Sequence, residues 1–100
     1  MAFDPKPNVI PYAGAKAAVC AMTVALAKAY APKVRVNCIA PGFLLTDVSD
    51  AWRHDRELEQ SVGLKRFAEP NEIVGTALYL ASRASSYTTG QIIRVDGGRS

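Results

Sequence analysis

The sequence has only two cysteines among its 100 residues, and they are placed where neither a disulfide nor a metal site is expected. Cys20 and Cys38 lie in apolar segments, without CxxC spacing and without a nearby histidine. This pattern is typical of buried, reduced thiols in a cytoplasmic protein. The scattered carboxylates show no metal-ligand spacing either, so no metal is predicted.

The sequence also lacks a cluster of charge and a long apolar run. Its net charge of +3 comes from basic residues spread along the whole chain, which argues against nucleic acid as a partner. The longest apolar run, residues 17–27, lies between Lys16 and Lys28 and is shorter than the ~18 residues that cross a membrane. The first residues, with Asp4 and two prolines, do not resemble a signal peptide. No membrane partner is expected.

The ordinary proportions of apolar and charged residues, 49% and 21%, predict one folded domain with five elements. Periodicity, proline and glycine place them as a helix, a strand, a surface helix, a helix and a strand at residues 12–30, 34–39, 47–59, 69–80 and 91–95. Pro32 ends the first helix, and Asp96-Gly97-Gly98 predicts a turn with positive φ. This order is the back half of an alternating α/β pattern with a parallel sheet. Two strands alone make an incomplete sheet, so part of the fold is expected to be missing.

Tyr12 and Lys16 are four residues apart at the start of the alanine-rich helix. This spacing puts both on one helix face, where an ammonium favours the phenolate form of a tyrosine whose free pKa is about 10. Such a tyrosine suits proton exchange with a carbonyl and alcohol pair. The same spacing also occurs by chance on many helices, so the pair alone leaves both interpretations open.

The pair lies in the motif YAGAK at residues 12–16, and three further motifs follow it: VRVNCIAPGFLLT, RFAEPNEI and TGQIIRVDGG, at residues 34–46, 66–73 and 89–98. Together they resemble the carboxyl-terminal half of a short-chain dehydrogenase/reductase, over almost the whole chain. The resemblance implies that residues 1–100 are the carboxyl-terminal portion of one Rossmann-like doubly wound domain. It implies an oxidoreductase that transfers hydride between NAD or NADP and an alcohol/ketone pair, and a homo-oligomer.

The resemblance also implies roles for individual residues. Tyr12 would be the catalytic acid/base, and Lys16 would lower the pKa of Tyr12 and bind the ribose of the nicotinamide. The cofactor loop would be Pro41, Gly42, Phe43 and Thr46. Pro41-Gly42 could instead be only the turn that ends a strand, and Thr46 before Asp47 would also serve as a helix N-cap. His54 is interpreted as a solvated side chain.

The family's glycine-rich phosphate turn, TGxxxGxG, is absent, and so is a serine in the residues before Tyr12. We therefore expect a truncated copy, cut immediately after the family's catalytic serine. Two hypotheses follow. The chain is part of an oxidoreductase that is active only with its amino-terminal half, or it is a catalytically inactive fragment that acts at most as an association module.

Overall fold

The computed structural model describes residues 10–45 and 54–98, with backbone alone for residues 10–13. The chain forms two compact units. The first comprises the chain up to Cys38 together with Tyr87–Ile93, and the second comprises Ile39–Ser86 with Arg94–Arg99. Thr46 and residues 47–53 of the predicted surface helix lie outside the described residues.

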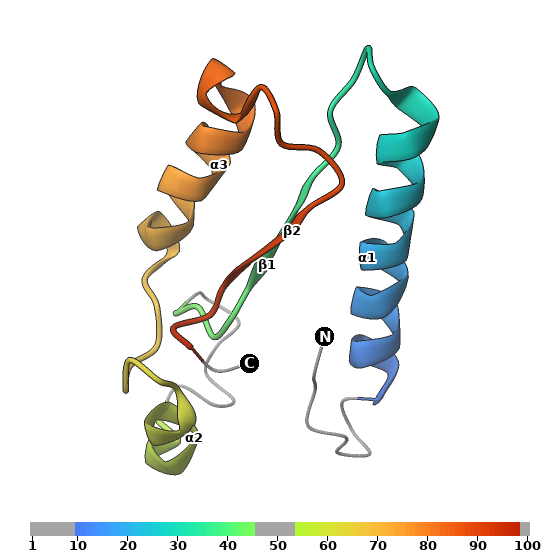
Figure 1. The fold of residues 1–100 in the computed structure, drawn as a ribbon. Coiled ribbons are helices and arrows are strands. Elements are labelled where there is room, and N and C mark those ends of the chain that lie inside the picture. The colour runs from blue at the N-terminus through green and yellow to red at the C-terminus, as the bar shows by residue number, and fades with distance from the viewer. Residues whose placement is uncertain (1–9, 46–53, 99–100) are drawn as a thin grey trace. The chain divides into compact units, whose positions relative to one another are not determined.

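The elements follow the predicted order (Figure 1). They are α1 (Ile10–Tyr30), β1 (Cys38–Pro41), α2 (Arg56–Ser61), the 3-10 helix η3 (Pro70–Ile73), α3 (Val74–Ala81), the 3-10 helix η4 (Arg83–Ser85) and β2 (Ile92–Val95). β1 and β2 pair in a two-stranded sheet. Cys38 N–H donates to Gln91 O and Gly42 N–H to Val95 O, both at 2.9 Å, so the register is constant and the strands are parallel. The expected α/β class with a parallel, incomplete sheet is confirmed.

The prediction for the first strand was wrong at its start. Residues 34–37 precede β1: one main-chain bond, from Gly90 N–H to Val36 O at 2.8 Å, and side-chain hydrogen bonds join them to the chain before β2. Val36 N–H donates to Thr89 Oγ1 at 3.1 Å. The Asn37 side chain donates to Thr88 O at 2.9 Å and accepts from Gln91 N–H at 3.0 Å. These three bonds hold the two chain segments together without forming a strand.

The predicted surface helix is described only from residue 54 onward. In this part the backbone is helical from Arg56, and Asp55 acts as N-cap and accepts from Leu58 N–H at 3.0 Å. The helix then continues to Ser61, two residues beyond the predicted end. His54 is exposed, as expected.

The other three elements confirm their predictions. α1 ends at Tyr30, two residues before Pro32. η3 and α3 follow Glu69 without a break, with Pro70 at the start. After β2, Gly97 and Gly98 have φ of 64° and 83°, the left-handed region in which glycine is favoured.

Burial is limited within the described residues. The buried apolar side chains are Ala27, Ala40, Val62 and Phe67, whereas large apolar side chains on both long helices are exposed. In the described part of the chain, no helix is both long and apolar enough to cross a membrane.

Candidate functional site

Tyr12 and Lys16 both belong to α1, and position 12 lies one turn before Lys16. The least exposed positions of the described helix are Lys16, Cys20, Thr23 and Ala27. Their spacing of three or four residues places them on one face. Lys16 is therefore a half-buried lysine on the protected face of α1, rather than a residue of its solvated face.

The protected face of α1 is fixed at its far end by close packing in the first unit. Thr23 and Ala27 are 5% and 4% exposed. A Cβ added at Gly90 would lie 3.4 Å from the Ala27 Cβ, and Gly90 has a φ of 72°. Such a Cβ would be in ordinary van der Waals contact with Ala27, so it is the left-handed φ that favours glycine at position 90.

The predicted cofactor loop follows β1 in the second unit. Pro41 is the last residue of β1, and Gly42 and Phe43 come directly after it. A Cβ at Gly42 would lie 2.8 Å from Asp96 Cα, which is closer than real Cβ atoms approach. Gly42 is therefore required by the backbone beside it. The loop lies at the carboxyl end of a parallel strand, where open α/β sheets bind ligands.

A short bridge holds this loop against the segment before α3. Leu44 forms an isolated parallel bridge with Ala68. Ala68 N–H donates to Phe43 O and Leu45 N–H donates to Ala68 O, both at 2.8 Å. The rings of Phe43 and the buried Phe67 meet edge to face, with 5.7 Å between their centroids. Residues 43–45 therefore have a defined position in the second unit.

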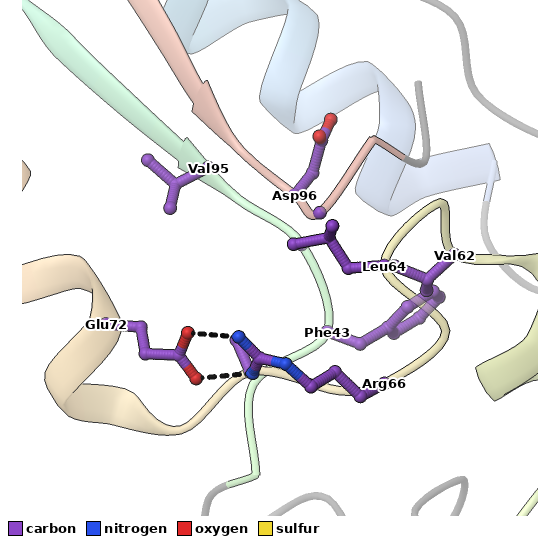
Figure 2. Close-up of a pocket in the computed structure, with 10 residues that line it drawn as sticks. Phe43, Val62, Leu64, Arg66, Glu72, Val95 and Asp96 are labelled. Carbon is purple, nitrogen blue, oxygen red and sulfur yellow. Dashed lines mark hydrogen bonds and ion pairs between the residues drawn. The ribbon is translucent and has the colours of Figure 1, made fainter.

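Arg66 and Glu72 form a bidentate ion pair beside this bridge (Figure 2). Arg66 Nη1 donates to Glu72 Oε1 at 2.7 Å, and Nη2 donates to Oε2 at 2.8 Å. Glu72 Oε1 also accepts from Glu69 N–H at 3.0 Å. The hydrogen bonds from Arg66 and then from the Glu69 backbone lower the pKa of Glu72 to about 2. The pair is thus fully charged at neutral pH.

The loop and the ion pair line one shallow hollow of about 100 Å³. Figure 2 shows Arg66 and Glu72 on one side of it, with Phe43, Leu64, Val95 and Asp96 around the rest. Pockets that enclose a whole small-molecule ligand have volumes of roughly 300–1,000 Å³. The hollow is therefore too small to enclose a dinucleotide.

The structure brings the predicted residues together in two groups: Tyr12 with Lys16 on α1, and Pro41, Gly42 and Phe43 at the end of β1. Each group lies in its own compact unit.

Among the described residues, no cluster of histidine, cysteine and acidic side chains could hold a metal ion. Arg66 and Glu72 both lie in the RFAEPNEI motif, but the sequence alone predicted no functional role for either. The sequence did contain a signal for Glu72: it lies three residues after Glu69 at the start of a predicted helix, which is the spacing of a capping box.

Comparison with known proteins identifies the family. The family model described as enoyl-(acyl carrier protein) reductase matches residues 3–100. The 3-oxoacyl-(acyl-carrier-protein) reductase of Chlamydia trachomatis is 45% identical over 95 residues, which cover 92% of this chain and 38% of that protein. Human dehydrogenase/reductase SDR family member 4 is 38% identical over 102 residues, covering 97% and 37%.

Solved structures agree with the sequence relatives. A gluconate 5-dehydrogenase from Burkholderia cenocepacia, in complex with NADP and tartrate, matches with a TM-score of 0.89 and 32% identity, covering 96% of this chain and 40% of that one. A short-chain dehydrogenase/reductase from Brucella melitensis matches with a TM-score of 0.88 and 35% identity, covering 96% and 40%. The chain thus spans about two fifths of the length of these relatives. Since the family model covers nearly all of it, the chain belongs to the short-chain dehydrogenase/reductase family of oxidoreductases.

Proposed function

We propose that this chain supplies the proton-transfer pair and the nicotinamide-side loop of an NAD(P)-dependent oxidoreductase that interconverts an alcohol and a ketone. The observation that carries the proposal is the placement of Tyr12 and Lys16 one turn apart on α1, in a chain of this family. In this role the nicotinamide, when bound, accepts or supplies the hydride. The residues of the chain manage the proton and the positions of the reactants.

Tyr12 gives its phenolic proton to the ketone oxygen during reduction and takes it from the alcohol during oxidation. Lys16 makes this transfer easier, because an ammonium close to the phenol stabilises the phenolate and lowers the pKa of Tyr12. The half-buried position of Lys16 supports this role, since water screens a charge less when the charge is partly buried. Lys16 also donates to the ribose hydroxyls of the nicotinamide.

Pro41, Gly42, Phe43 and Thr46 contact the nicotinamide in this proposal, together with Tyr12 and Lys16. The described part of this loop starts at the carboxyl end of β1 and borders a hollow of about 100 Å³, which is too small to enclose a whole dinucleotide. The remainder of NAD or NADP must then be bound by residues outside this chain. The NADP bound to the Burkholderia relative supports a nicotinamide cofactor.

We further propose that residues 1–100 form the carboxyl-terminal half of a single domain, because they span 38% of the Chlamydia reductase. A small alcohol or ketone as substrate and a homo-oligomeric state are part of the same proposal. Neither Cys20 nor Cys38 forms a disulfide, which is the state expected in the cytoplasm.

A second function, an association module without catalysis, is favoured by one observation. Large apolar side chains on both long helices are exposed, among them Met22 at 59% and Leu78 at 64%. Exposed apolar surface of this kind promotes association with another protein surface.

The test uses the complete domain that contains this chain. Tyr12→Phe should lower kcat by at least roughly a hundredfold, because the proton donor is lost, while the Kd for NADH stays nearly unchanged. Lys16→Ala should lower kcat and raise the Kd for NADH. Tyr30→Phe removes a phenol from the exposed end of the same helix and is the matched control. Equal loss of NADH affinity in the Tyr12 and Lys16 variants would contradict the division of roles, and full activity of Tyr12→Phe would exclude the proposed chemistry.

A further inference from the structure

The Arg66–Glu72 pair is connected to the proposed cofactor loop by consecutive residues of one short segment. Arg66 is followed by Phe67, whose ring packs against the ring of Phe43. Ala68 comes next and makes both main-chain hydrogen bonds of the bridge, to Phe43 O and from Leu45 N–H. A change in the position of Arg66 would therefore be transmitted through Phe67 and Ala68 to the backbone at residues 43–45.

The other end of the pair is anchored on the helix start. Glu72 lies in η3, and its Oε1 accepts from Glu69 N–H as well as from Arg66. A carboxylate held by a backbone donor offers a guanidinium a fixed partner, and two parallel hydrogen bonds fix orientation as well as distance. The segment 66–68 is thus held between η3 on one side and the loop after β1 on the other.

We propose that Arg66 and Glu72 are positioning residues that set the path of the cofactor loop at Phe43–Leu45, through Phe67 and Ala68. This inference rests on the proposed nicotinamide binding for its functional meaning, but not for its geometry. The pair needs no contact with cofactor or substrate to act in this way.

The geometry is tested by amide hydrogen exchange on the chain. Arg66→Gln and Glu72→Gln should each speed the exchange of the Leu45 and Ala68 amides roughly fivefold, the range expected for a partly exposed ion pair. The amides of Cys38 and Gly42, which pair β1 with β2, should keep their rates. Arg83→Gln and Glu57→Gln remove the same charges from exposed positions in η4 and α2 and serve as matched controls.

The conservative variant Arg66→Lys separates positioning from a general effect on folding. It keeps a positive charge beside Glu72, whose carboxylate still accepts from Glu69 N–H, and should bring the exchange of Leu45 and Ala68 part of the way back toward the original rates. Unchanged exchange at these two amides in the two glutamine variants would overturn the inference. Equal acceleration of all amides would overturn it as well, because the pair would then support the unit as a whole.

NADH titration of the complete domain supplies the functional measurement. The Arg66→Gln variant should raise the Kd for NADH roughly fivefold, and the Arg66→Lys variant should recover part of this loss. If exchange changes only at Leu45 and Ala68 but the Kd for NADH does not change, the pair has no role in positioning the loop for the cofactor. The proposal that the chain binds nicotinamide would remain intact. Absence of NADH binding to the unaltered domain would instead contradict the proposed function, and the exchange data would still decide whether the pair positions the loop.

Discussion

Gly42 illustrates at the scale of one residue how close the two chain segments after β1 and β2 come. A Cβ at this position would lie 2.8 Å from Asp96 Cα and 3.0 Å from Asp96 Cβ. The neighbouring atoms belong largely to backbone, so a side chain cannot be accommodated by a rotamer change. From the sequence, Gly42 was predicted to be a turn or cofactor residue, and the structure adds a packing requirement at this position.

Gly42→Ala should therefore destabilise the chain by about 1–3 kcal/mol, because the backbone around Asp96 must move to admit a methyl group. Gly75→Ala is the matched control, since nothing lies within 4 Å of a Cβ at this helical position. It should stabilise the chain by roughly 0.5–1 kcal/mol. Urea unfolding of both variants measures the difference. A Gly42→Ala chain as stable as the original would contradict the close approach.

At the scale of elements, the segment directly before β1 is held in place by the side chain of Asn37. Asn37 bonds to Thr88 O and to Gln91 N–H, at 2.9 and 3.0 Å. It therefore takes the place of a main-chain partner just before β1 and β2 begin their regular pairing. The alternation of apolar and polar residues in this segment is typical of a strand, which explains why the predicted strand began too early.

Asn37→Ala should lower the free energy of unfolding by about 1–3 kcal/mol, since Gln91 N–H and Thr88 O both lose a partner. Asn37→Asp keeps the acceptor for Gln91 N–H and removes the donor to Thr88 O, so exchange at the Gln91 amide should stay slow. Asn71→Ala, at an exposed position of η3, is the control. The idea fails if Gln91 exchanges equally fast in the two Asn37 variants.

At the scale of the whole molecule, the two parallel strands and the helices leave much apolar surface uncovered. Val19, Met22, Val74 and Leu78 are each at least half exposed. The chain spans only 38% of the Chlamydia reductase and 40% of the Burkholderia dehydrogenase. Since a domain normally buries such side chains in one core, these faces are suited to a protein surface rather than to water.

We expect the chain to self-associate as its concentration rises. Met22→Lys and Leu78→Lys should each raise the midpoint concentration of association at least roughly tenfold, because a buried apolar side chain contributes about 1.5–3 kcal/mol. Ala29→Lys and Ala77→Lys add the same charge at exposed positions of α1 and α3 and are the matched controls. Sedimentation velocity over a concentration series measures the midpoint. A chain that stays monomeric throughout would exclude association through these faces.

The sequence by itself determined the features that depend on near neighbours along the chain. Alanine content and the position of Pro32 predicted α1, and Gly97 and Gly98 predicted a turn with positive φ. The four-residue spacing of Tyr12 and Lys16 placed both on one helix, and the order of motifs gave the family.

Only the tertiary structure decided the features that join distant parts of the sequence. Asn37 replaces a ladder hydrogen bond because Thr88 and Gln91 are folded beside it. The bridge from Ala68 to the loop after β1, and the orientation of Arg66 toward Glu72, likewise require the second unit to be folded. Local propensity contains no information on such partners. The strand boundary and the support of the candidate cofactor loop therefore became visible only in three dimensions.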